Sequence, residues 1–596
     1  MKKPANPLDR VKGLTNAVLR FPLSAALLLT FAAVLAVSIQ TNRDYEALLL
    51  SCAVGVFLSA VLQAAHERFS RRPSARFFLY GCGAVLTLGY YLLIRQIPKD
   101  TEELWIRSAV ALFALFFAFL WVPVIKSKVT FNESFMAAFK AVFHCLLYAA
   151  VLFGGCSLVA AAVNTLIVHV SYKAYPHIAN IVFVLFAPLF FLSLIPVYPG
   201  RQDETADAEA LAAREERVNK AVSCPRFLEV LVSYIIIPLT AVFSAILILY
   251  IALNIKGEFW TNNLLEPLLV SYAVAVILGY LLSSRLDNRF ARLFRMIFPK
   301  VLVPIVLFQV TASVLRLRDA GITHGRYFVI LFGIFAACAG FVMSIVPVRK
   351  NGIIAALLIV CSAVSILPPA DAFTLSRRSQ EKRLEAVLTK NGMLQNNRIT
   401  PNGTVSDRDK EIITASAEYL ARLGYTDSIE WMPRQFVIYH DFYKTFGFDR
   451  HDQPEPAGRW ISVSVDASQP VDIAGYDLLT RVEISEGQTD FKLCSLDHLG
   501  SRYTLRRERA GDMADIVLTD GKGGEVIRFH IDDIFARYAG FTAEKSELSM
   551  EDATFSAEND RVKLTLIVQN ANMQSSDAAR DDSYYYVDFY ALIRFQ

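Results

Sequence analysis

Hydrophobic positions follow one pattern up to about residue 370 and a different pattern beyond it. The first part holds about eleven apolar stretches, each long enough as a helix to cross the roughly 30 Å hydrocarbon core of a bilayer. Only helices and closed barrels satisfy their backbone polar groups there, so we predict a polytopic helical bundle. Its first span is too long for a signal peptide and lacks a small-residue cleavage site, so we expect it to be retained. The predicted spans are Phe21–Ile39, Tyr45–Ala65, Phe77–Ile94, Trp105–Ile125, Ala141–Thr165, Pro176–Val197, Phe227–Leu253, Leu264–Ser283, Val301–Leu315, Tyr327–Pro347 and Gly352–Leu367.

The pattern beyond Pro369 is that of a soluble domain. Leucine and valine recur at helical spacing over 376–394, and Ser406 is placed to cap a second helix over 406–424. Short β-branched and aromatic runs, separated by Gly, Asp and Ser, then predict strands at 459–466, 503–509, 561–569 and 583–595. The fold class that follows is an α-helical polytopic membrane bundle and a soluble α+β domain with a mostly antiparallel sheet. The predicted parts are a transmembrane domain (1–370), a helical linker (371–430) and a β-rich domain (431–596).

Charge divides the chain at the same place. Residues 1–370 contain 33 Lys and Arg against 19 Asp and Glu, whereas residues 371–596 contain 27 against 37. Such an acidic soluble part argues against nucleic-acid binding, which needs a basic surface. The N-terminus and the loops on its side of the predicted spans carry 24 Lys and Arg, and the opposite loops carry 8. By the positive-inside rule we expect a cytoplasmic N-terminus and an extracytoplasmic C-terminal domain.

Polar residues inside the predicted spans are the first candidates for function, because ionisable groups are costly in hydrocarbon. Lys140 and His144 are four residues apart and share a helical face, and Asn164 lies near the other end of the same span. Such a stripe is able to line a solute or proton path. The alternative is structural: Lys140 extends to the lipid headgroups and His144 bonds a neighbouring helix. Glu229 is likewise either a functional group inside a span or a structural residue, and in the second case we expect it to pair with Arg226.

Prolines inside spans and a polar group in the soluble domain are weaker candidates. Prolines break helices and expose carbonyls to cavities in transporters, but they are also common in ordinary membrane helices. In the soluble domain His440, Asp441 and His451 flank an aromatic stretch, and a site there requires them to converge. The chain lacks a Walker A loop, HExxH, GxSxG and a GxGxxG after a strand, so we expect no cofactor and no metal. The prolines concerned are Pro188, Pro196, Pro238 and Pro304.

Two short motifs resemble a known family. The first is Ser379-Gln380, Arg383-Leu384, Leu388 and Asn391-Gly392-Met393-Leu394, which is similar to the SQxxRLxxxLxxxGxL segment of the DUF4153 family. The second, Val471-Asp472-Ile473-Ala474-Gly475-Tyr476-Asp477, resembles that family's DIxGYD element, and the order of spans and soluble tail is similar along nearly the whole chain. The resemblance implies a multi-pass protein of the bacterial inner membrane, and it supplies no catalytic residue.

Three functional hypotheses remain open. We expect a non-enzymatic envelope protein whose bundle binds or moves a small or lipidic solute, while the outer domain senses or gates. The alternative is a membrane enzyme similar to lipid-linked glycosyltransferases, for which Asp44 and Glu46 in the first outer loop are the acidic candidates. A third hypothesis is an envelope sensor or scaffold. The expected partners are membrane lipids and a cytoplasmic protein at the loop 198–226.

Overall fold

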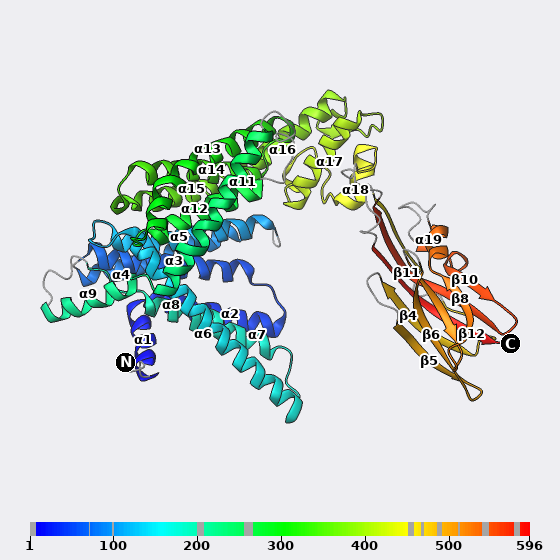
Figure 1. Ribbon diagram of the computed structural model, residues 1–596. Coiled ribbons are helices and arrows are strands. Elements are labelled where there is room, and N and C mark those ends of the chain that lie inside the picture. The colour runs from blue at the N-terminus through cyan, green and yellow to red at the C-terminus, as the bar shows by residue number, and fades with distance from the viewer. Residues whose placement is uncertain are drawn as a thin grey trace. The chain divides into compact units, whose positions relative to one another are not determined.

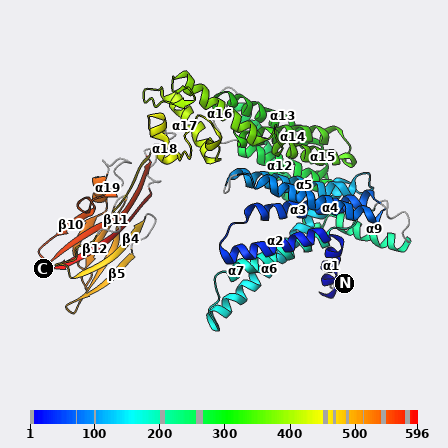
Figure 2. The same cartoon turned by 180° about the vertical axis from the view of Figure 1, so that it is seen from behind.

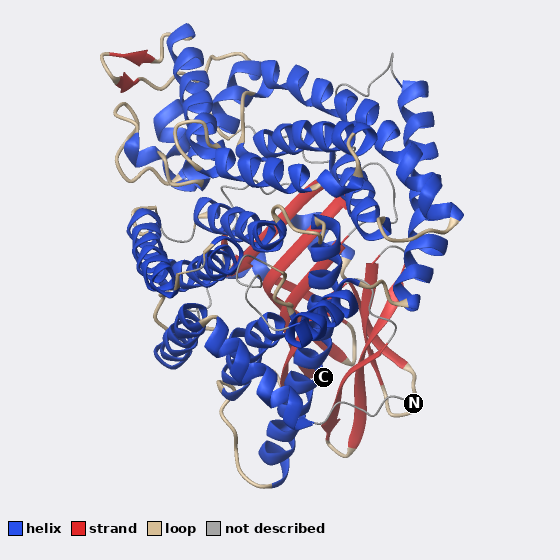
Figure 3. Ribbon diagram, turned by 90° about the vertical axis from the view of Figure 1, so that its left-hand side faces the viewer, coloured by secondary structure: helices blue, strands red, loops and turns tan. Residues whose placement is uncertain are grey.

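The computed structural model describes most of the chain as two compact units, Met1–Arg450 and His451–Gln596. The first unit is helical apart from one two-stranded hairpin, and the second is built from strands, as the colouring of Figure 3 shows. The described residues are 7–70, 72–97, 101–199, 208–254, 266–450, 458–465, 470–485, 491–510, 513–538, 547–576 and 584–596.

The helical unit contains the membrane bundle (Figure 1). Among the described residues, ten helical segments between 22 and 366 are long and apolar enough to cross a membrane, and Pro267–Ser283 is a shorter apolar helix. The prediction of a polytopic bundle is therefore confirmed. Its helices are α1 (Pro7–Arg20), α2 (Pro22–Thr41), α3 (Glu46–Phe69), α4 (Pro73–Ile94), α5 (Glu102–Trp121), α6 (Phe131–Leu166), α7 (Ala174–Ala179), α8 (Ala187–Leu194), α9 (Ala208–Val222), α10 (Arg226–Val230), α11 (Ile237–Asn254), α12 (Glu266–Ser283), α13 (Arg289–Ala320), α14 (His324–Ile345) and α15 (Gly352–Ile366).

Local sequence explains where several of these helices begin. Thr130 and Glu133 form a capping box at the start of α6, so this helix begins ten residues before the predicted span. Two spans contain a π-helical turn, η2 (Asn180–Phe186) before α8 and η4 (Leu231–Ile236) before α11. In both spans a proline follows two residues after the turn, and the wider turn accommodates the missing proline N–H.

Three further helices, α16 (Ala372–Lys390), α17 (Asp407–Arg422) and α18 (Ile438–Phe446), belong to the same unit as the bundle. Ser406 accepts a hydrogen bond from the Asp409 N–H and caps α17, as the sequence predicts. A short hairpin, β1 (Leu394–Gln395) and β2 (Arg398–Ile399), joins α16 to α17. Figures 1 and 2 show these helices at one end of the bundle and α1 and α9 at the other.

The strands of the second unit form two sheets, and both sheets contribute to one hydrophobic core. The first has the order β4-β12-β11-β3-β9, with β10 also paired to β11, and is antiparallel except for the β3–β9 pair. The second is the antiparallel meander β5-β6-β7-β8. The elements are β3 (Gly458–Val465), β4 (Leu478–Ser485), β5 (Phe491–His498), β6 (Ser501–Ala510), β7 (Met513–Thr519), β8 (Glu525–His530), α19 (Asp532–Tyr538), β9 (Glu547–Leu548), α20 (Met550–Ala553), β10 (Thr554–Glu558), β11 (Val562–Ser576) and β12 (Tyr584–Phe595).

Candidate functional site

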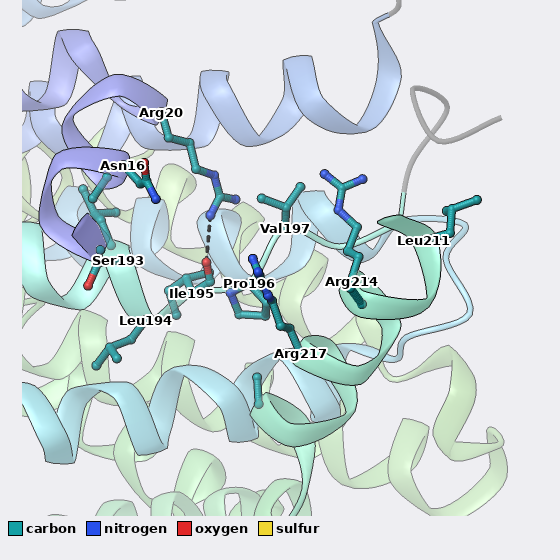
Figure 4. Close-up of a pocket in the computed structure, with 15 residues that line it drawn as sticks. Asn16, Arg20, Ser193, Leu194, Ile195, Pro196, Val197, Leu211, Arg214 and Arg217 are labelled. Atoms are coloured by element: carbon teal, nitrogen blue, oxygen red, sulfur yellow. Dashed lines mark hydrogen bonds between the residues drawn. The ribbon is translucent and has the colours of Figure 1, made fainter. Parts of the chain in front are cut away.

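A cavity of about 840 Å³ lies at the end of the bundle formed by α1, the end of α8 with the residues after it, and α9. We call it the arginine cavity, because Arg20, Arg214 and Arg217 line it and their guanidinium groups point toward the same space (Figure 4). No acidic side chain is among the described residues that line it. Its other lining residues are Gly13, Asn16, Ala17, Leu192, Ser193, Leu194, Ile195, Pro196, Val197, Leu211, Ala213 and Ala221.

Arg20 is fixed in place by contacts to two other elements. Its Nε and one terminal nitrogen donate to the two carboxylate oxygens of Glu67 on α3, at 2.9 and 2.8 Å. Its other terminal nitrogen donates to the backbone carbonyl of Ile195 at 2.7 Å, the bond drawn in Figure 4. Glu67 also accepts from Gln63 at 2.9 Å. The Arg20–Glu67 pair therefore orients one wall of the cavity and neutralises one of its three positive charges.

Arg214 and Arg217 come from α9 and are three residues apart, so they lie on the same face of that helix. Arg217 is exposed and Arg214 is partly buried. Guanidinium groups bind phosphate and carboxylate oxygens through paired N–H donors. The cavity therefore has the charge and the donor geometry for an anion.

A second cavity, of about 360 Å³, lies between helices of the bundle and is lined by apolar residues, so we call it the apolar cavity. Leu192 lines both cavities, which makes them neighbours. Phe183 and Val184 from the π-helical turn η2 and the following Pro188 form part of its wall. Two of the four prolines thus line cavities, Pro188 here and Pro196 in the arginine cavity. The remaining lining residues are Leu28, Phe31, Ala53, Val56, Phe57, Ala60, Leu112, Phe116, Phe119, Val142, Cys145, Leu146, Ala187 and Phe191.

Lys140, His144 and Asn164 all lie on α6 but do not share one site. The Lys140 ammonium donates to the carbonyls of Ser223 (2.6 Å) and Lys220 (3.2 Å), and so satisfies the C-terminal end of α9. His144 is exposed, and its Nδ1 is 2.7 Å from the Lys140 carbonyl. Asn164 accepts a hydrogen bond from the backbone N–H of Val170 at 2.8 Å. At 1.5 Å per residue, Asn164 lies about 36 Å along the helix from Lys140. The structure thus gives Lys140 a structural contact, and the transport path stays a prediction.

The other predicted site residues are likewise separate. Glu229 lies 3.4 Å from the amide nitrogen of Asn288, which caps α13. His440 is exposed, while Asp441 accepts the Val437 N–H at 2.9 Å and so caps the first turn of α18. His451 lies outside the described residues. Within the described ranges no group of three or more His, Cys, Asp and Glu is able to hold a metal ion.

The opposite end of the bundle carries a buried ionic network that sequence reasoning did not predict. Arg107 on α5 pairs with Glu103 at 2.7 Å and with the fully buried Asp371, the N-cap of α16, at 2.6 Å. The Tyr425 hydroxyl donates to the other Glu103 oxygen at 2.5 Å. Burial and the neighbouring Glu103 raise the pKa of Tyr425, so it remains a protonated donor. We call these four residues the junction network.

The DUF4153 motif explains a second contact at this end. Gln380 donates to the carbonyls of Ala320 (3.1 Å) and Ile322 (3.0 Å) in the turn between α13 and α14. Arg383 donates to Ala320 at 2.7 Å, and the Ser379 hydroxyl accepts the Ile322 N–H at 3.0 Å. Ser379, Gln380 and Arg383 therefore bind the backbone of one turn, and we call them the turn clamp.

A comparison with protein-family models matches residues 23–397 to DUF4153, a domain of unknown function. The chain belongs to the DUF4153 family. The DUF4153 region covers the bundle and ends just after the turn clamp, so the element at 471–477 lies beyond it. No curated protein and no solved structure matches the chain significantly.

The arginine cavity of this DUF4153 protein was missed because its three arginines are far apart in sequence. Arg20 ends a helix before the first span, and Arg214 and Arg217 lie almost two hundred residues later. One feature of the sequence could have indicated the cavity. All three arginines belong to loops or to the N-terminal tail on the side of the bundle that is rich in Lys and Arg.

Proposed function

We propose that the helical bundle binds an anionic amphiphile, a lipidic molecule with a phosphate or carboxylate group. The observation that carries this proposal is the adjacency of a large cavity lined by three arginines and an apolar cavity, with Leu192 in the wall of both. The anionic group would lie against Arg214 and Arg217, and a hydrocarbon chain would occupy the apolar cavity.

The charge balance supports an anion. Three arginines line the cavity, and no acidic residue is among the described residues of its wall. Each hydrogen bond from a charged donor to an anion contributes about 1.5–3 kcal/mol. The apolar cavity adds about 0.8 kcal/mol for each methylene that leaves water.

We further propose that the protein resides in the bacterial inner membrane with the arginine cavity at the cytoplasmic end. The excess of Lys and Arg in the loops at that end supports this orientation. The C-terminal residues would then be extracytoplasmic, in a position to sense a ligand or to gate the bundle.

The glycosyltransferase-like alternative has no comparable support. Its candidate Asp44 accepts the Glu46 N–H at 2.8 Å, a local contact at the start of α3. This contact is typical of a helix beginning.

The test is a binding measurement on the full chain in detergent, with the double variant Arg214→Gln/Arg217→Gln. Phosphatidylglycerol is titrated against phosphatidylcholine of the same chain length, and bound lipid is counted by native mass spectrometry. We expect a preference for the anionic lipid, reduced on the order of 100-fold in the variant because two charged contacts are lost.

Lys220→Gln is the matched control, because Lys220 lies exposed on the same helix but does not line the cavity. Its affinity for phosphatidylglycerol should equal that of the unaltered chain. Equal binding of the two lipids, or equal losses in both variants, would rule the proposal out.

A further inference from the structure

A third cavity, of about 370 Å³, lies between the loop that follows α5 and the turn that precedes α15. Lys126 comes from the first of these segments, and Arg349 and Lys350 come from the second. We call it the lysine cavity.

The lysine cavity carries three positive charges and no opposing charge in its wall. Lys126, Arg349 and Lys350 are exposed, and no acidic residue is among the described residues that line the cavity. The nearest carboxylate in sequence, Glu133, accepts the Thr130 N–H at 2.7 Å and pairs with Arg285, so it is already engaged. Unlike Arg20 in the arginine cavity, these three cations form no ion pair among the described residues.

Two helices begin at this cavity, and α15 adds to its positive potential because its first turn contains no carboxylate. Phe131 is the first residue of α6, and Gly352 is the first residue of α15. Asn351 stands at the N-cap of α15 but does not cap it; instead, its amide donates to Asn132 at 3.3 Å. No side chain caps the first turn of α15, and its Ile354 N–H bonds the Asn351 carbonyl at 2.9 Å, so the N–H groups that precede Ile354 are the donors of the kind that bind anions.

The loop that carries Lys126 is held in a defined conformation. Arg68 donates from Nε to the Ile125 carbonyl at 2.8 Å and from a terminal nitrogen to the Lys126 carbonyl. The backbone of Lys126 has φ +56°, a left-handed conformation that non-glycine residues seldom adopt. Arg68 also bonds the Pro199 carbonyl, which places the lysine cavity at the same end of the bundle as the arginine cavity.

Glycine is required where α15 begins. A Cβ on Gly352 would lie 2.5 Å from the Trp121 Nε1, so the indole packs directly against the first turn of the helix. Tryptophan beside Lys and Arg is typical of the level of lipid headgroups in a membrane. Aromatic, hydroxyl and cationic groups thus surround the uncapped N–H groups of α15.

We propose that the lysine cavity binds a phosphate group, contributed either by the headgroup of an anionic phospholipid or by a free phosphate ion. Lys126, Arg349 and Lys350 supply the charge, and the first turn of α15 supplies backbone donors. This site is separate from the arginine cavity and does not depend on what that cavity binds.

The test uses the full chain in detergent and the triple variant Lys126→Asn/Arg349→Gln/Lys350→Gln. Asparagine tolerates the left-handed conformation at 126, and glutamine removes the charge but keeps a polar side chain. Inorganic phosphate is titrated by calorimetry in one arm, and phosphatidylglycerol against phosphatidylcholine by native mass spectrometry in the other. We expect at least 10-fold weaker binding of phosphate or of phosphatidylglycerol in the variant.

Lys128→Gln is the control, because Lys128 is exposed in the same loop but does not line the cavity. Both arms use the Arg214→Gln/Arg217→Gln background, so that lipid bound in the arginine cavity does not contribute. In that background, binding of phosphate alone assigns a free ion, and binding of phosphatidylglycerol alone assigns a headgroup. Binding of neither probe, or equal binding by the triple variant and the control, overturns the proposal. If the triple variant does not fold, the single change Lys350→Gln answers the same question with an expected 3-fold loss.

Discussion

Arginine side chains lie at both ends of the helical unit, but their neighbours differ. At the end near α16, Arg107 contacts two carboxylates, Glu103 and Asp371, so its positive charge is fully matched. At the end near α9, Arg20 pairs with Glu67, and Arg20, Arg214 and Arg217 line a large cavity. Arg107 is enclosed by carboxylates with little solvent contact and holds helices together, whereas three arginines beside a large cavity are where we propose that a ligand binds.

The junction network gives the largest expected effect. In Asp371→Asn the buried Arg107 loses one of its two carboxylates, and breaking a buried ion pair in this way costs roughly 3–5 kcal/mol. We expect a loss near the lower limit, because Glu103 still contacts Arg107. Denaturant unfolding of the full chain in detergent measures it.

The control is Asp407→Asn, at an exposed position in the first turn of α17. It should change the unfolding free energy by less than about 1 kcal/mol. Similar losses of unfolding free energy in the two variants would mean that the buried charges of the junction network do not stabilise the fold more than an exposed charge does.

The turn clamp gives the next largest effect. Gly321 has φ +69°, and a Cβ there would lie 2.9 Å from the Gln380 amide nitrogen. Gly321→Ala should therefore destabilise the chain by about 2 kcal/mol, through backbone strain and displacement of Gln380. Thermal unfolding of the full chain in detergent checks it.

Gly325 is a matched control in the neighbouring helix α14, because a Cβ there meets nothing within 4 Å. Gly325→Ala should leave stability unchanged or raise it by up to about 1 kcal/mol, since alanine favours the helix. The two substitutions are expected to have opposite signs. A loss at both positions would show that the clamp is not the cause.

The apolar cavity gives an effect on binding rather than on stability. Ala53 lines it, so Ala53→Leu should fill space without straining the bundle. We expect about 10-fold weaker binding of phosphatidylglycerol with long acyl chains, equivalent to about 1.4 kcal/mol, and little change for a short-chain form. Lipid titration by native mass spectrometry measures both.

Ala162→Leu on the exposed surface of α6 is the companion substitution. It adds the same side chain outside the cavity and should leave both affinities unchanged. Equal weakening of short- and long-chain lipid by Ala53→Leu would contradict a chain-binding role for the apolar cavity.

Sequence reasoning predicted elements well and contacts poorly. The Ser406 cap, the helices around it and the four predicted strands follow from local periodicity and capping, and all are present. The start of α6 was placed ten residues late, because hydropathy does not register a helix that continues out of the apolar stretch to a capping box. Periodicity is a property of single segments, so it predicts where single helices and strands lie.

The candidate site depends instead on which segments meet. Lys140 is four residues from His144 in the sequence, yet its ammonium bonds the end of α9, more than eighty residues away. The arginine cavity joins α1, the end of α8 with the residues after it, and α9. Charge counting placed these segments at one end of the bundle, but it carried no information on which side chains converge.

The smallest expected effect concerns the ion pair between Lys390 on α16 and Asp409 on α17. Asp409 on α17 accepts from the Lys390 ammonium at 2.8 Å, and this contact lowers the pKa of Asp409. The pKa of Asp409 is lower in the folded state than in the unfolded state, so the pair stabilises the fold above about pH 4, the usual pKa of Asp. This stabilisation is lost as the pH falls through the folded-state pKa. Lys390→Gln should therefore cost less than about 1 kcal/mol at pH 7, because Lys390 is largely exposed, and the difference from the unaltered chain should shrink in acid. Unfolding measured between pH 3 and pH 7 tests this, and a difference that grows in acid would show that another group governs the titration.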